Sequence, residues 1–159
     1  MKVYEIDGIA PVVDPTAYVH PSAVLIGDVV IGPGAYIGPC ASLRGCIVRR
    51  NGMVGMNAVV MDNAVVGESA IVAAQSFVKA GMDIPPRMLA GGVPAKVMRE
   101  LTELEMAWKV EGTGVYHDLV RRCHGTLREV EALTAVEPDR KRLKLPELKT
   151  LKETRRAKA

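Results

Sequence analysis

The stretch from Val13 to Val78 decides the fold. It reads VDPTAYVHPSAVLIGDVVIGPGAYIGPCASLRGCIVRRNGMVGMNAVVMDNAVVGESAIVAAQSFV, and an aliphatic residue returns at almost every sixth position. This period matches neither the 3.6 residues of an α-helix nor the alternation of a strand, and a fixed short period is typical of stacked repeats. The stretch therefore predicts a solenoid. The recurring aliphatic residues are Val13, Val19, Leu25, Ile31, Ile37, Leu43, Val48, Val54, Val60, Val66, Val72 and Val78.

A small residue follows most of these aliphatic residues at the fourth position, as Ala35 follows Ile31 and Ala41 follows Ile37. Glycine directly follows several of them, as in Ile31-Gly32 and Val54-Gly55, and it permits tight corners that a side chain would strain. Three hexads make one triangular coil of a parallel β-helix, so the chain predicts about four coils with the aliphatic side chains inside. The predicted fold class is an all-β solenoid followed by a C-terminal α-helical hairpin.

The repeat is one residue short at a single place. From Leu43 to Val48 the step is five residues, across Leu43-Arg44-Gly45-Cys46-Ile47-Val48. A tighter or bulged corner is expected there.

Composition limits the number of domains and the cellular compartment that can be expected for the protein. The chain has 159 residues, 48% of them hydrophobic, which suits one packed domain and a tail. Its three cysteines form no CxxC pair and indicate a reducing compartment. The N-terminal residues lack the apolar region of a leader, and no apolar run is long enough to cross a bilayer. A cytoplasmic protein without a membrane partner is the expectation.

Four segments are expected along the chain. Residues 1–12 form an N-terminal strand that caps the stack, 13–92 the β-helix, 93–133 two helices and 134–159 a basic tail. The first helix is predicted to begin near Pro94, because Val97, Leu101, Leu104 and Trp108 make one apolar stripe. The second is predicted from about Tyr116 to Leu133. The basic tail carries no recognised nucleic-acid motif, so no nucleic-acid partner is expected.

Three segments carry a family resemblance. They are Val19-His20-Pro21-Ser22-Ala23-Val24-Leu25-Ile26-Gly27-Asp28, Gly38-Pro39-Cys40-Ala41-Ser42-Leu43-Arg44-Gly45, and the run from Cys46 to Ala58. Together they resemble the γ-class carbonic anhydrase-like hexapeptide-repeat family. Within it the chain is most similar to the phenylacetic acid degradation (PaaY) group, because the C-terminal motifs Gly92-Val93-Pro94-Ala95-Lys96, Trp108-Lys109 and Pro138 to Leu143 also match.

The resemblance implies a left-handed β-helix and a homotrimer. It also implies a zinc or iron ion held between subunits by three histidines, with carbonic anhydrase activity or hydrolysis of acyl-CoA thioesters. Such a metal lowers the pKa of bound water and supplies hydroxide near neutral pH.

The sequence departs from the family in the segment that carries the metal ligands. In the family the motif matching Leu43-Arg44-Gly45 is followed by an aspartate and about two further coils that carry the histidine ligands. Here it runs directly into Cys46. The expectation is therefore a shortened scaffold with no metal site and no cofactor, whose hydrolase centre is lost. A working thioesterase or carbonic anhydrase of the parent type is the alternative.

Arg44 is the candidate catalytic residue, because the resemblance gives the matching arginine a role in positioning an anion or a carboxylate. Its usual aspartate partner is absent, so an exposed corner arginine or an interface ion pair is the competing interpretation. Cys46 beside it is interpreted as a core or corner residue rather than a nucleophile. His20, His117 and His124 are the only histidines, and they are interpreted as surface or packing residues.

A second alternative is a hexapeptide acyltransferase that binds coenzyme A. The run from Val72 to Lys79 and the exit through Gly91 to Lys96 also resemble the last coils of that class. Lys79 and Lys96 are the candidate phosphate-binding residues. Such an enzyme needs a general base, and His20 is the only histidine in the repeat.

Overall fold

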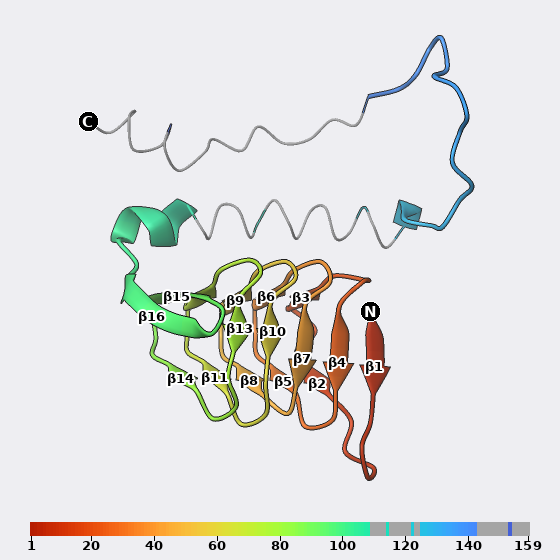
Figure 1. Ribbon diagram of the computed structural model, residues 1–159. Helices are drawn as coiled ribbons and strands as arrows, with labels where there is room; N and C mark the ends of the chain where they lie inside the picture. The colour runs from red at the N-terminus through yellow and green to blue at the C-terminus, as the bar shows by residue number, and fades with distance from the viewer. Residues whose placement is uncertain (109–113, 115–121, 123–124, 143–152, 154–159) are drawn as a thin grey trace. The chain divides into compact units, whose positions relative to one another are not determined.

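The computed structural model describes residues 1–108, 114, 122, 125–142 and 153. The chain divides into two units, Met1–Met106 and Ala107–Ala159, and each is described by itself. The first unit is a solenoid whose coils each contribute one short strand to each of three sheets (Figure 1). Within the described residues no helix has the length and apolar character that crossing a membrane requires.

Each sheet is parallel along the solenoid. The first has the order β1 (Lys2–Tyr4), β4 (Val24–Ile26), β7 (Ser42–Arg44), β10 (Val59–Val60) and β13 (Phe77–Val78). The second has the order β2 (Val12–Val13), β5 (Val30–Ile31), β8 (Ile47–Val48), β11 (Val65–Val66) and β14 (Asp83–Ile84). The third has β3 (Tyr18–Val19), β6 (Tyr36–Ile37), β9 (Met53–Val54), β12 (Ile71–Val72), β15 (Met88–Gly92) and the antiparallel β16 (Ala95–Glu100).

The solenoid makes about five turns, one more than the hexad count predicted. The extra turn arises because β1 pairs in parallel with β4 at one end and β14 and β15 continue the sheets at the other. The predicted parallel β-helix is confirmed, and its architecture is consistent with the left-handed form that the resemblance implies.

The hexad frame forms the core. Leu25, Ile31, Ile37, Leu43 and Val48 are at most 1% exposed. The small residues of the repeat, from Ala23 to Ala70, are also buried, so large and small side chains alternate inside the solenoid. Each fully buried aliphatic side chain contributes roughly 1.5–3 kcal/mol before the entropy of ordering is subtracted.

The corner residues correct one expectation. Gly55 and Gly67 do not adopt positive φ; an added Cβ would lie 2.5 Å from backbone atoms of the next coil, so these glycines permit close approach of coils. The left-handed conformation occurs instead mainly at polar corner residues, as at Asn57 (φ +56) and Gln75 (φ +59). Asparagine tolerates this conformation better than most residues.

The short step at Leu43–Val48 is visible in the strand register. Val24 pairs with Ser42, eighteen residues later, whereas Ser42 pairs with Val59, seventeen residues later. Beyond the step the spacing returns to eighteen, as Ile47 pairs with Val65. Leu43 and Val48 are both fully buried, so the inward frame crosses the step unbroken. We call this corner, Arg44-Gly45-Cys46, the seam.

The C-terminal helix begins later than predicted. Residues 95–100 form β16, which turns back and pairs with β15, and a helix begins at residue 103 and is described to residue 108. The prediction of a helix from Pro94 is wrong because pairing covers the free edge of β15, which would otherwise leave its backbone groups exposed. Val97, counted in the helical stripe, is 37% exposed on β16.

In the second unit, residues 127–142 form no helix or strand and are exposed. The predicted second helix therefore does not continue to Leu133. Its first part, with His117, Cys123 and His124, lies largely outside the described residues, as does most of the predicted basic tail.

Candidate functional site

The seam lies where the chain passes from β7 to β8. Gly45 adopts φ +49, its N–H donates to the Ile26 carbonyl at 3.2 Å, and its carbonyl accepts the N–H of Asn63 at 2.7 Å. These bonds join the seam to the coils on both sides. The backbone ladder thus tolerates a corner that is one residue short.

Arg44 forms an ion pair within its own chain, with a partner that the sequence did not predict. Its Nε donates to Oδ1 of Asp62 at 3.0 Å, and the two side chains are 54% and 34% exposed. Asp62 stands eighteen residues after Arg44, close to the seventeen-residue coil that separates Ser42 from Val59, and that spacing was the available signal. Arg44 therefore has an aspartate partner, although the one implied by the resemblance is absent. An ion pair this exposed contributes about 0–1 kcal/mol.

The Asp62 side chain also occupies the space next to the Cα of Gly45. A Cβ placed on Gly45 would lie 2.8 Å from Oδ1 of Asp62, the same atom that accepts from Arg44. The missing side chain at Gly45 is what permits Asp62 to reach Arg44.

A hollow of about 250 Å³ opens beside this pair. Its lining combines acidic, basic, glycine and aliphatic residues from the seam and from the N-terminal turn. The lining residues are Ile6, Asp7, Ile9, Ile26, Gly27, Asp28, Arg44, Gly45, Asp62 and Asn63.

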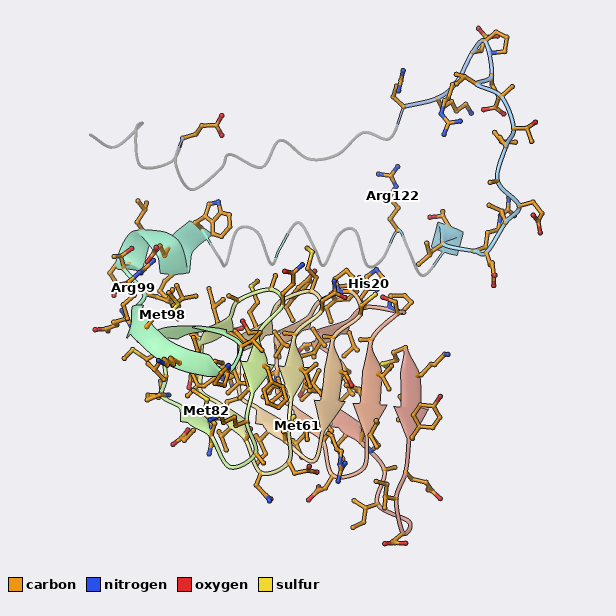
Figure 2. All side chains as sticks on the ribbon, viewed as in Figure 1. His20, Met61, Met82, Met98, Arg99 and Arg122 are labelled. Carbon is orange, nitrogen blue, oxygen red and sulfur yellow. The ribbon has the colours of Figure 1, made fainter. Side chains whose placement is uncertain are left out.

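His20 lies at a different corner. It follows β3 in the third sheet, and Figure 2 shows it on the opposite side of the solenoid from Met61, the neighbour of Asp62. Its Nδ1 accepts the Ser22 N–H at 3.1 Å and lies 2.7 Å from Ser22 Oγ. Partial burial lowers the pKa of the His20 imidazole, with a smaller contribution from the N-terminal charge. The geometry is that of a turn, and the Asp14 carboxylate contacts Thr16 in the same way.

Cys46 is a core residue. Its side chain is fully buried, and burial raises the pKa of the thiol to about 12. A thiol that stays protonated is a poor nucleophile. Cys40 is exposed, and its Sγ lies 3.5 Å from Ser22 Oγ.

Lys79 and Lys96 are both exposed. Lys79 follows β13 and Lys96 belongs to β16, and these two strands contact each other. Neither lysine lies beside the seam hollow.

The described residues of one chain do not fit the implied metal. Among the described residues no three or more His, Cys, Asp and Glu side chains gather in a group that could hold a metal ion. His20 is the one histidine in the repeat, and its Nδ1 is already engaged by Ser22.

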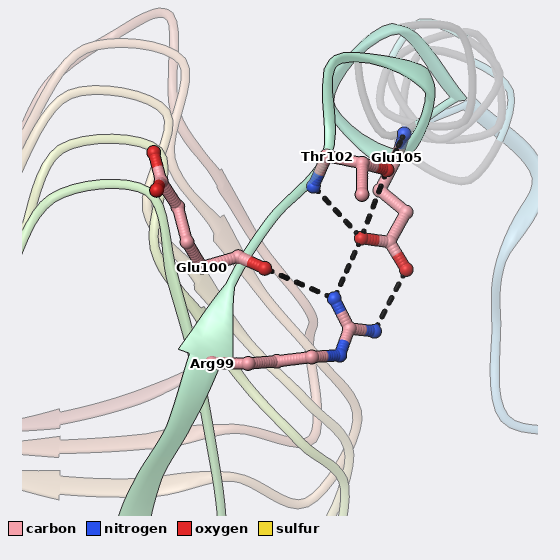
Figure 3. A network of polar contacts seen from close by, with 4 residues as sticks. All are labelled: Arg99, Glu100, Thr102 and Glu105. Carbon is pink, nitrogen blue, oxygen red and sulfur yellow. Dashed lines mark hydrogen bonds and ion pairs between the residues drawn. The ribbon is translucent and has the colours of Figure 1, made fainter.

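A buried polar network at the start of the C-terminal helix was also missed. Arg99 donates two hydrogen bonds of 2.8 Å to the Glu105 carboxylate, which also accepts from the N–H of Thr102 at 2.9 Å (Figure 3). Glu105 is 3% exposed, and its pKa falls to about 2, mainly through the Arg99 bonds. Thr102 and Glu105 form a capping box, a signal readable in the sequence.

Comparison with known proteins gives close relatives. No protein-family model matches the chain. The carnitine operon protein CaiE of Citrobacter koseri is 43% identical over 187 residues, covering 91% of this chain and 95% of the relative. That aligned length exceeds the 159 residues of this chain, so the relative carries residues that have no counterpart here.

Solved structures share the fold. The BC4754 gene product of Bacillus cereus, provisionally assigned as an acetyltransferase, aligns with a TM-score of 0.57 at 22% identity over 78% of this chain and 97% of its own. A hexapeptide transferase family protein of Anaplasma phagocytophilum aligns with a TM-score of 0.50 at 28% identity, over 76% and 97%. With the identity to CaiE, the hexad core and the five-turn parallel solenoid, the chain belongs to the CaiE family of hexapeptide-repeat β-helix proteins.

Proposed function

We propose that this chain is a shortened, homotrimeric scaffold of the γ-carbonic anhydrase-like, PaaY-like type that lacks the metal hydrolase centre. The seam is the observation that carries the proposal. The inward frame passes through Leu43 and Val48 without a break, although this coil is one residue short. An unbroken inward frame supports the proposed loss of whole coils, because a stack from which they are removed in this frame remains foldable.

The length of the CaiE alignment supports the same proposal. The relative has residues that this chain lacks, and the seam is the place in the repeat where the register changes. We place the missing coils, with the histidine ligands, between Gly45 and Cys46. His20 remains in the repeat, but its ring accepts a hydrogen bond from the Ser22 N–H within a turn.

The test is metal content together with hydrolysis. Untagged protein purified without chelators is expected to hold less than about 0.1 zinc or iron per chain, and to show no chelator-sensitive hydrolysis of phenylacetyl-CoA or hydration of carbon dioxide. The matched control is a variant that receives, between Gly45 and Cys46, the CaiE residues lacking a counterpart here. Stoichiometric metal and activity in the 159-residue chain would instead support a thioesterase or carbonic anhydrase of the parent type.

The trimer is tested separately. Light scattering across micromolar concentrations is expected to give three times the mass of the chain. A monomer throughout this range contradicts the proposed assembly.

A second candidate is an acyltransferase that binds coenzyme A. It is favoured by the 28% identical hexapeptide transferase structure and by exposed Lys79 and Lys96 on contacting strands. Calorimetric titration with coenzyme A is the test. Binding that weakens about tenfold in Lys79→Ala or Lys96→Ala, but not in the remote Lys2→Ala control, would favour it. Absence of binding would remove it.

A further inference from the structure

The seam hollow has the dimensions of a site for one small molecule. Its volume of about 250 Å³ is below the roughly 300–1,000 Å³ of pockets for drug-sized ligands. A whole coenzyme A molecule is larger than this hollow.

The hollow holds hydrogen-bond donors and acceptors that no neighbouring residue engages. Arg44 uses Nε for Asp62, and its two terminal guanidinium nitrogens bond to no residue that the structure describes. In the same part of the chain the carboxylates of Asp7 and Asp28 have no hydrogen bond or ion pair. Unlike an acidic cluster, the hollow therefore presents donors for a carboxylate together with acceptors for an ammonium group.

Aliphatic side chains from the N-terminal turn line the hollow as well. Ile6 and Ile9 are 47% and 51% exposed, and their backbones form a bridge across the turn at Asp7. Cδ1 of Ile6 lies 3.4 Å from the position of a Cβ on Gly27, so the turn closes against the solenoid. These side chains offer a surface for methylene groups.

We propose that the seam hollow binds a small aliphatic zwitterion. Its carboxylate accepts from the terminal nitrogens of Arg44, its ammonium group donates to Asp28 and Asp7, and its methylene groups contact Ile6 and Ile9. A simple anion is repelled by the carboxylates of Asp7 and Asp28, and a simple cation is repelled by the guanidinium of Arg44. Only a ligand of both charges complements the hollow. Neither a metal nor coenzyme A takes part, so this proposal stands apart from the proposed function.

Titration followed by amide NMR shifts tests the ligand class. The probes are ω-amino acids of two to six carbons, with butyrate and butylammonium as single-charge controls. At least one ω-amino acid is expected to bind about tenfold or more tightly than either control, because each control loses one of the two charge contacts. Shifts are expected at Gly27, Gly45 and Asn63. Equal binding of a control, or no saturable shift at these amides, overturns the proposal.

Substitutions locate the contacts. Arg44→Met is expected to weaken the best ω-amino acid about tenfold, and Asp28→Asn is expected to do the same while sparing butyrate. Arg49→Met, an exposed arginine outside the hollow, is the matched control and is expected to change nothing. If Arg44→Met fails to fold, the exposed turn residue Asp28 still tests the site. Unchanged affinity in Asp28→Asn contradicts the proposal.

Discussion

Nε of Arg44 lies 3.0 Å from Oδ1 of Asp62, across a corner that is one residue shorter than that of the coil before it. The same Asp62 atom lies 2.8 Å from where a Cβ on Gly45 would stand. The ion pair and the glycine are therefore two parts of one arrangement. Its energetics can be separated by substitution.

Gly45→Ala is expected to destabilise the protein by about 2 kcal/mol in urea unfolding. The alanine must adopt φ +49, which costs an L-residue roughly 1–2 kcal/mol, and its Cβ displaces Asp62. Gly81→Ala is the matched control, because it has φ +70 but open space around its Cβ. It is expected to lose only about 1 kcal/mol.

The contribution of the contact with Asp62 follows from a double-mutant cycle. Asp62→Ala alone is expected to cost at most about 1 kcal/mol, since the pair with Arg44 is exposed. In the double variant, Gly45→Ala is expected to cost no more than Gly81→Ala does. Full additivity of the two substitutions would show that Asp62 does not restrict position 45.

The two described cysteines are expected to differ in reactivity. In a Cys123→Ser background, Ellman's reagent is expected to modify Cys40, which is exposed, and to leave Cys46 unmodified until the protein unfolds. Burial of Cys46 and its pKa of about 12 keep the thiolate population negligible at pH 8. Rapid modification of both thiols in native protein would contradict the burial of Cys46 at the seam.

The left-handed corner residues give a stabilising substitution. Gln75→Gly is expected to raise the free energy of unfolding by about 0.5 kcal/mol, because glycine removes the strain of φ +59 at the cost of a more flexible unfolded chain. Asn57→Gly, with φ +56, is the comparison and is expected to gain less, since asparagine tolerates this conformation. Destabilisation by Gln75→Gly beyond that of Asn57→Gly would show that the Gln75 side chain stabilises the corner.

The hexad frame made the solenoid predictable because the six-residue spacing alone identifies which side chains point inward. Leu43 and Val48 are buried as the frame requires, even across the short step. The pair between Arg44 and Asp62 could have been predicted, because the two residues stand about one coil apart in the sequence. The resemblance pointed instead to an aspartate directly after Gly45, a position that Cys46 occupies here.

The C-terminal exit could not be predicted in the same way. The spacing of Val97 and Leu101 fits a helix, and local pattern carries no information about the open edge of β15. The capping box at Thr102 and Glu105 marks the true start of the helix, and Pro94 does not.

Glu105→Gln is expected to cost about 1–2 kcal/mol at pH 7, because the buried carboxylate accepts from Arg99 and Thr102 while Arg99 itself is half exposed. The folded pKa of about 2 lies below the ordinary value of 4.5, so this stabilisation is present above pH 4.5 and is lost as the pH falls toward 2. Urea unfolding of both chains between pH 7 and 2 checks it: their difference is expected to shrink over that window. Glu68→Gln, an exposed glutamate, is the control and is expected to stay within about 0.5 kcal/mol of the parent. A difference that persists unchanged at pH 2 would show that Glu105 stabilises the exit by packing rather than by its charge.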